Sequence, residues 1–571
     1  MPSNEKKITF EEEGLCDLYR LSKYHKFDPV CKEKIDQSDG VIVVLGPPLF
    51  ALSMIQTGSR LFPKNFYFAL HHSWIAQQSV TCGAEKKNNL FLRAGVRLDQ
   101  KENGKFRFML TDFDSQKPPI MYFVNFLGPN AWSEYPEMLL LSRLSIGLEK
   151  KFIGAMSSSM WLERDINDKL FTRCLMKEDG KITVPDFIAF KCCFSVKKSK
   201  NAVFNRFVKD GTLVIVSETM PLSPTPDEEY GFSNRLLSMS DPTLRQLLRD
   251  SILKFIKQNS QYDEIVVKPS GTRFCGCSGV KIFNVSKARN TADEAQIELI
   301  SSHIVTLLRE SRREDSVLVD GRIKPPCIKL NSSSFNGPES FKQIDSWDWV
   351  LRIVCSRSLK SKHGITSGAL ARVAKYGIPV NAGSEGGFWA SVENAFERAG
   401  IQYKGHGEKS LLDLGANFFS CWDKFEQARV REDEKPLNSA TDMVGLDVMI
   451  DLRCVDGEMI PVPVIIEVND HDCGGSDAFD LLNPNRKGAL LESYLEHAFS
   501  KGKKVMQKNI SLYGKAVYSF DEKSVINQTV DMSEATMSIQ EENCKSSDSR
   551  HSCNSDTWPL SIDNLYHCYA M

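Results

Sequence analysis

The stretch GLDVMIDLRCVDGEMIPVPVIIEVND, residues 445–470, limits the possible folds more than any other part of the chain. On its first arm Leu446, Val448, Ile450 and Leu452 alternate with polar or larger residues, which is the period of a half-buried strand. Asp456-Gly457, between the two arms, is a strong turn signal. The sequence therefore predicts a long antiparallel hairpin.

The length of the turn decides which side chains of this hairpin face each other. A three-residue loop centred on Gly457 makes Asp447 and Glu467 cross-strand partners, whereas a two-residue loop shifts the register by one and separates them. Glu467 and Asn469 share a face in either case. Such oxygen ligands suit Mg²⁺. The alternative is that these side chains form the polar face of an exposed hairpin. Residues 464–468 are, however, too apolar for an exposed strand.

The polar end of the hairpin, VIIEVNDHDCGG at residues 464–475, is compatible with a metal site, a nucleophile at the tip of a strand, or a polar turn. His471 and Cys473 stand in a short turn without a second ligand pair, which disfavours zinc. His471 is also the sole nearby base for Cys473, which disfavours a cysteine nucleophile.

Two further segments carry candidate binding residues. In EIVVKPSGTRFCGCSGVKIFNV, residues 264–285, a strand delivers Lys268 to a loop rich in glycines and hydroxyls, and backbone N–H groups of such a loop can bind phosphate. The alternative is an ordinary hairpin with a long loop. Further on, Arg352 lies within an apolar strand and Arg372 in a segment, Gly368 to Ala374, that is undecided between helix and strand. A guanidinium there needs a partner or a cleft; an internal Arg–Asp pair or a solvated face would also satisfy it.

The rest of the chain indicates mixed α/β organisation. Apolar runs at 41–45 and 120–127, each closed by a Gly-Pro turn, predict buried parallel strands of an open α/β domain. Gly46 is compatible with a phosphate contact or with a plain turn. A helix is predicted from Asp168 to Glu178 and another after Asp241-Pro242. The apolar face of the second is predicted to comprise Leu244, Leu247, Leu248, Ile252, Phe255 and Ile256.

Composition bears on partners and compartment. The net charge of −1 gives no reason to expect nucleic acid or an anionic membrane as partner. No apolar run approaches the ~18 residues of a membrane span, and the polar, acidic beginning of the chain is not a secretory signal. The 16 cysteines lack paired Cys-x-x-Cys spacing, so reduced thiols in a cytoplasmic protein are expected.

Taken in order, five segments resemble the ATP-grasp superfamily, in particular its carboxylate–amine ligases such as D-alanine–D-alanine ligase, RimK-type and carnosine-synthase-like enzymes. The matching segments are Asp168-Lys169 with Val184-Pro185, IVVKPSG…GCSGV, VLVDGRI, LARVAKYGIPVNAGSEGG and GLDVMID…IIEVN. The resemblance implies an α/β (α+β) ATP-grasp domain over 166–506, whose nucleotide-covering flap subdomain is about 185–320. A small open-sheet α/β domain over 41–165 would precede it. A polar lead-in, 1–40, and a mostly disordered tail, 507–571, would flank these domains.

The resemblance also implies a role for each matching residue. ATP would be contacted by Lys169, Lys268, Gly276, Ser278, Gly279, Asp320 and Ile323. The metal ions, Mg²⁺ or Mn²⁺, would be held by Asp447, Glu467 and Asn469, which favours the three-residue hairpin loop. Arg352 and Arg372 would steady an acyl-phosphate, so that Gly368 to Ala374 would be a strand. Substrate would be bound by Asn381, Gly387, Gly474 and Gly475.

The implied activity is an ATP-dependent ligase that joins a small carboxylate to an amine. The alternatives are a small-molecule kinase or a non-catalytic ATP-binding regulator or scaffold. The sequence departs from the family at three places: Asp320-Gly321 stands where Glu-Lys is common, Gly445 stands where D-alanine ligases carry an arginine, and the flap is long and contains two cysteines. Segments at about 205–240 and 400–440 have no assigned role, and neither the substrates nor the oligomeric state can be derived.

Overall fold

The computed structural model describes a large part of the chain. The described residues are 41–46, 57, 60–61, 66–70, 96–100, 106–110, 120–125, 155–156, 165–192, 198–216, 239–270, 279–286, 294–311, 315–328, 347–375, 388–402, 405–433, 441–469, 476–486 and 488–513. The predicted lead-in and most of the predicted tail lie outside this set. Residues 507–513 are helical, because α15 runs from Ala489 to Tyr513.

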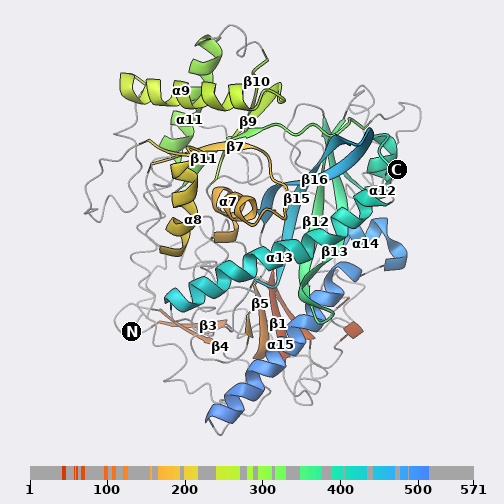
Figure 1. Ribbon diagram of the computed structural model, residues 1–571. Coiled ribbons are helices and arrows are strands. Elements are labelled where there is room, and N and C mark those ends of the chain that lie inside the picture. Colours follow the sequence, from red (N-terminus) through yellow and green to blue (C-terminus); the bar gives the residue numbers. More distant parts are fainter. Residues whose placement is uncertain are drawn as a thin grey trace, which may run out of the picture.

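The described residues form a mixed α/β fold built on several β-sheets (Figure 1). The first sheet has the order β2-β1-β5-β6, and its strands are Phe66–Leu70, Val41–Gly46, Ile120–Asn125 and Ala155–Met156. All its pairings are parallel, as predicted for the runs at 41–45 and 120–127. A separate antiparallel pair joins β3, Val96–Gln100, to β4, Phe106–Leu110.

The second sheet is covered by helices on both faces. Its order is β10-β9-β11-β7-β8, with strands Lys281–Asn284, Glu264–Pro269, Ser316–Gly321, Phe187–Lys191 and Leu213–Ile215. One core holds Ile188 and Phe190 together with helices α9, Pro242–Gln258, and α11, Glu294–Glu310. The alternate residues Phe187 and Ala189 enter a second core with α7, Lys169–Asp179, and α8, Lys198–Lys209. The alternation follows the pleat of a strand that is buried on both sides.

The predicted helix boundaries are confirmed by their caps. Asp168 accepts hydrogen bonds from the backbone of the first turn of α7, and Gly180 ends that helix in the left-handed conformation, with φ 72°. Asp241 caps α9, and Pro242 occupies its first position. The predicted apolar face of α9 is wrong at one residue: Leu247 is 38% exposed, whereas the other five residues of that face are buried.

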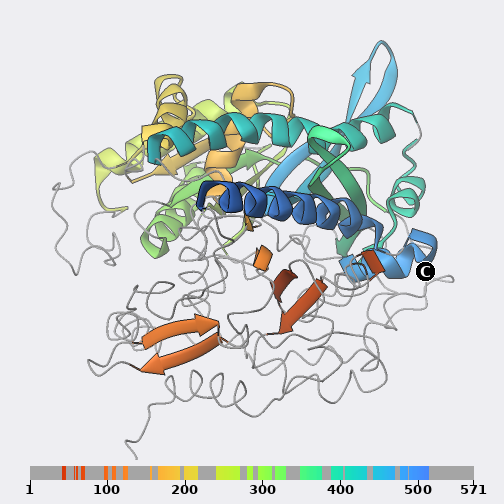
Figure 2. The same cartoon turned by 90° about the horizontal axis from the view of Figure 1, so that it is seen from below.

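The third sheet is antiparallel throughout and carries most of the candidate site residues. Its order is β14-β13-β12-β15-β16, with strands Phe388–Ala390, Ser361–Lys375, Trp347–Ser358, Met443–Val455 and Glu458–Asn469. The segment Gly368 to Ala374 is therefore a strand. One face packs on α13, His406–Asp433, through residues such as Trp349, Leu446 and Phe418. Figure 2 shows α13 lying along this sheet, where the sequence left about 400–440 unassigned.

The turn of the long hairpin differs from the prediction. Val455 pairs with Glu458, so the loop has two residues, and Asp456 and Gly457 both have positive φ (53° and 85°), as a tight hairpin turn requires. The register nevertheless pairs Asp447 with Glu467, because it shifts between Asp447 and Val448. Ile466 is the extra residue of this β-bulge. The bulge supplies the one-residue shift that a longer loop would have supplied.

Candidate active site

Asp447 lies at the centre of a row of polar side chains that crosses the third sheet. It pairs across the strands with Arg352 on one side and Glu467 on the other. Arg352 Nε lies 2.7 Å from Asp447 Oδ1. Asp447 Oδ2 has longer contacts, at 3.3 Å to Arg352 and 3.5 Å to Arg372. Among the alternatives for Arg352, the internal Arg–Asp pair is the one observed, and its partner is the predicted metal ligand.

The row extends to both edges of the sheet. At one edge, Arg372 pairs with Trp389 of β14, and its guanidinium lies 5.6 Å from the centre of that indole ring. At the other edge, the amide nitrogen of Asn469 lies 3.4 Å from Asp447 Oδ2, and Lys169 Nζ lies 3.4 Å from Glu467 Oε1. Two guanidinium groups, two carboxylates, an amide and an ammonium thus lie on one sheet face.

A second, more deeply buried cluster joins the second sheet to the bulge. Lys268 Nζ lies 2.9 Å from Asp320 Oδ2 and donates a hydrogen bond to the Ile466 carbonyl at 3.0 Å. Arg173 NH1 lies 2.6 Å from Asp320 Oδ1, and its NH2 donates to the same Ile466 carbonyl at 2.6 Å. The bulged residue therefore offers its carbonyl to two cations, and the lysine expected at phosphate is held against the strand expected to bind metal.

Within each cluster, the charged groups shift one another's pKa values. Burial would raise the pKa of Asp447, but the guanidinium groups of Arg352 and Arg372 outweigh burial and lower it. For Asp320, burial is likewise outweighed by Arg173 and Lys268, so its pKa is lowered. Burial lowers the pKa of the Lys268 ammonium, and Asp320 opposes this in part. Both carboxylates are consequently anions at neutral pH.

The base of the Gly-rich loop is tied to the start of α7. Ser270 Oγ donates to Asp168 Oδ1 at 2.7 Å and accepts from the backbone N–H of Leu170 at 2.9 Å. Lys200 Nζ lies 2.9 Å from Asp168 Oδ2. Burial would raise the pKa of Asp168, but Lys200 and its other partners lower it. Asp168 thus organises the helix that presents Lys169.

The donor set fits Mg²⁺ or Mn²⁺ in its chemistry. Among the described residues, no group of three or more His, Cys, Asp and Glu side chains is gathered as a metal cluster. The set here is instead two carboxylates and an amide on one face, brought together by the register. Asp447 Oδ2 makes only the longer contacts, so it is the oxygen best placed to exchange a guanidinium for a metal ion. Glu467 is partly exposed, which leaves its carboxylate accessible to the same ion.

Several predicted residues are placed differently or lie outside the described residues. Asp320 is engaged through its side chain, while its backbone lies in the sheet opposite Phe187 and Val266; a contact of this residue with ATP stays a prediction. Ile323 is 4% exposed, and the carbonyl of Gly279 contacts His303 Nε2 at 2.9 Å. The predicted residues outside the described set are Gly276, Ser278, Asn381, Gly387, Gly474 and Gly475, together with His471 and Cys473.

Arg173 and the Ile466 carbonyl were not among the residues predicted from the sequence. A signal for Arg173 was present, because it follows Lys169 by four residues and such residues share one face of a helix. No sequence signal indicates the bulge, because the alternation of the second arm is broken by its prolines.

No protein-family model matches the chain, and no curated protein matches it. Among solved structures, the crystal structure of D-cycloserine synthetase DcsG aligns with 82% of this chain and 100% of that chain, at 11% identity and a TM-score of 0.36. Among the described residues, no helix is sufficiently long and apolar to cross a membrane.

Proposed function

We propose that the protein is an ATP-dependent carboxylate–amine ligase that forms an amide or peptide bond on a small carboxylate or amino-acid substrate. The observation that carries the proposal is that Lys169 and Lys268 lie beside the strands of the Asp447–Glu467 pair. The charged side chains gathered there are the cations Lys169, Arg173, Lys268, Arg352 and Arg372 and the carboxylates Asp320, Asp447 and Glu467. The ordered resemblance of the five sequence segments to ATP-grasp ligases supports the same conclusion.

The charges suit a reaction between two anions. A substrate carboxylate and the polyphosphate of ATP repel each other, so the site must supply positive charge. Lys169 and Lys268 would contact the phosphates, and Arg352 and Arg372 would hold the acyl-phosphate. Asp447, Glu467 and Asn469 would hold Mg²⁺ or Mn²⁺, which would neutralise charge on the phosphate oxygens when bound.

In the proposed reaction, a carboxylate oxygen attacks the γ-phosphorus of ATP and ADP leaves. The amine nitrogen then attacks the acyl carbon, phosphate leaves with the carboxylate oxygen, and the nitrogen loses a proton. No protein nucleophile is needed. The residues of the chain would bind and orient the substrates and keep water out. The loop that follows Ser270 would cover the acyl-phosphate intermediate.

Oxygen-isotope transfer tests this route. With the carboxylate oxygens labelled and amino-acid pairs screened as substrates, we expect the label in the released phosphate. Turnover without transfer would exclude the acyl-phosphate route. A stable phosphorylated product, formed without dependence on an amine, would instead identify a small-molecule kinase.

The variant Glu467→Gln tests the metal site. The substitution removes the charge of one ligand, so we expect the rate of ADP release with Mg-ATP to fall by about 100-fold. Glu458→Gln is the matched control, because Glu458 is exposed at the start of the same strand, and it should retain activity. Retained activity in Glu467→Gln would remove Glu467 from the metal site.

A further inference from the structure

Arg173 is the most buried charged side chain of the candidate site, at 1% exposure. It lies on α7 one turn after Lys169, so the two side chains project from the same face of the helix. Its guanidinium contacts two acceptors at once, Asp320 Oδ1 and the Ile466 carbonyl, each at 2.6 Å. Two acceptors on different sheets suit the planar fork of arginine.

Lys268 binds the same two acceptors. Its ammonium lies 2.9 Å from the other oxygen of Asp320 and 3.0 Å from the Ile466 carbonyl. One carboxylate is therefore shared by two cations, and the three charges sum to +1. If Arg173 were absent, Lys268 and Asp320 would form a neutral pair. An ammonium has three donors, and the described residues occupy two of those of Lys268.

We propose that Arg173 is a positioning residue of this site. Arg173 offsets the charge of Asp320, so that Asp320 can hold the Lys268 ammonium in place without cancelling its charge. The positive charge of Lys268 then remains available to the polyphosphate of a nucleotide. The inference rests on the proposed function for the identity of the ligand. The arrangement of Arg173, Asp320 and Lys268 is testable without it.

The test measures how fast an amine-specific acylating reagent labels Lys268 in the ligand-free, full-length protein, read by mass spectrometry. The positive charge of Arg173 disfavours the Lys268 ammonium. Removing it in Arg173→Met should therefore favour the ammonium and slow labelling by about threefold or more. Arg173→Lys keeps the charge and should label within about twofold of the wild type.

Two further variants control the measurement. Arg357→Met also removes a guanidinium that is paired with two carboxylates, Asp423 and Glu426, but these lie in a different cluster, so Lys268 labelling should stay unchanged. Asp320→Asn removes the anion that favours the ammonium, so labelling should accelerate. This opposite sign keeps the inference falsifiable if Arg173→Met does not fold.

Equilibrium binding of ATP to the same proteins separates the two proposals. We expect Arg173→Met to weaken ATP binding by about tenfold and Arg173→Lys to restore most of it. If the wild type binds no ATP but labelling responds as described, the proposed function is wrong and the positioning role stands. Unchanged or faster labelling in Arg173→Met, or unchanged or slower labelling in Asp320→Asn, overturns the positioning role even if ATP binds.

Discussion

Asp447 is the residue on which the candidate site depends. It accepts contacts from Arg352, Arg372 and the Asn469 amide, and it is 6% exposed. A buried guanidinium without a counter-ion is costly, so this carboxylate compensates two arginines as well as offering an oxygen to a cation. One side chain therefore serves both the stability of the sheet and the proposed chemistry.

We expect Asp447→Asn to lower the free energy of unfolding by about 3 kcal/mol at neutral pH, because two buried cations lose their anion. The pKa of Asp447 is lowered in the folded state. Its contribution is therefore present above the ordinary carboxyl pKa and is lost as pH falls through the lowered value, where the two proteins should converge. Urea unfolding measures this.

The control for that measurement is Asp451→Asn. Asp451 lies on the same strand but pairs with the exposed Arg453, so the change should be below about 0.5 kcal/mol. An equal loss in both variants would contradict the compensation of Arg352 and Arg372 by Asp447.

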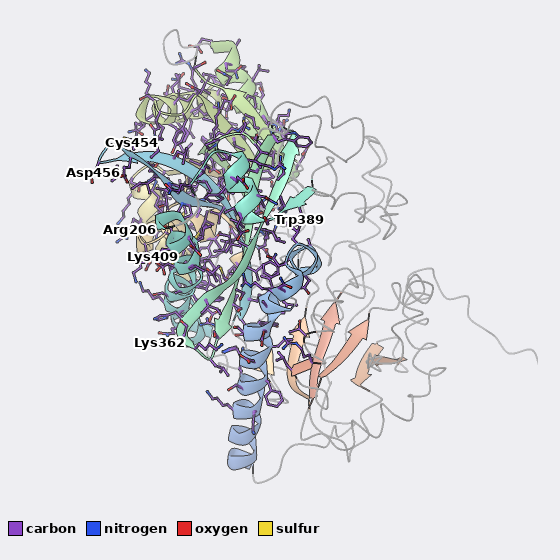
Figure 3. All side chains as sticks on the ribbon, turned by 90° about the vertical axis from the view of Figure 1, so that its right-hand side faces the viewer. Arg206, Lys362, Trp389, Lys409, Cys454 and Asp456 are labelled. Carbon is purple, nitrogen blue, oxygen red and sulfur yellow. The ribbon has the colours of Figure 1, made fainter. Side chains whose placement is uncertain are left out.

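At the scale of the element, the β15–β16 hairpin separates its turn from its functional end. Figure 3 shows Cys454 and Asp456 at the projecting tip of the hairpin. The bulge at Ile466, close to the other end, brings Glu467 opposite Asp447 and presents the carbonyl that Arg173 and Lys268 share. The turn at the tip therefore only connects the two strands, whereas the bulge sets which residues of the proposed metal site face each other.

Gly457→Ala tests this separation. The φ of 85° disfavours any side chain, and a Cβ there would meet nothing within 4 Å. The cost is therefore conformational, and we expect the free energy of unfolding to fall by about 1 kcal/mol. ATP affinity, measured by calorimetry, should be unaltered. A loss of affinity beyond about threefold would show that the turn also governs the register of the ligands.

At the scale of the molecule, α15 connects the sheets. It packs against β12 and β13 of the third sheet and also against β5 and β6 of the first. Its polar anchor is Asp442, which is fully buried before β15 and lies 2.7 Å from Lys501 and 3.4 Å from His497 of α15. Arg357 of β12 lies 3.8 Å away. An ion cluster thus fastens the helix to the sheet of the candidate site.

Acid should loosen this anchor. Burial would raise the pKa of Asp442, but Lys501, His497 and Arg357 lower it to about 2. A lowered pKa stabilises the fold above the unfolded value of about 3.9, and that stability is lost as pH falls toward 2. We expect Asp442→Asn to remove about 2 kcal/mol at neutral pH and to reduce the loss of stability between about pH 4 and 2.

The exposed Asp250 supplies the control for the anchor, since Asp250→Asn should follow the wild-type pH dependence of unfolding. If Asp442→Asn also follows it, Asp442 does not anchor α15 through its charge.

Helix ends and turns were predicted well from the sequence. The start of the helix at Asp168 was predicted to within one residue, and the Asp241 cap and the Asp456-Gly457 turn were predicted directly, because a cap or turn depends on a few adjacent residues. Gly368 to Ala374 could not be assigned from its pattern, because its alanines suit helix and strand alike. Its pairing with β12 makes it a strand.

Alternation and turn chemistry are local properties, so the residue types at the ends of the strands can be read from the sequence alone. The register, in contrast, is a product of the tertiary fold. It placed one extra residue at Ile466, paired Asp447 with Glu467 despite the short turn, and used Asp320 to join Arg173 to Lys268. These outcomes depend on burial and on charges far apart in the chain, which no local pattern records.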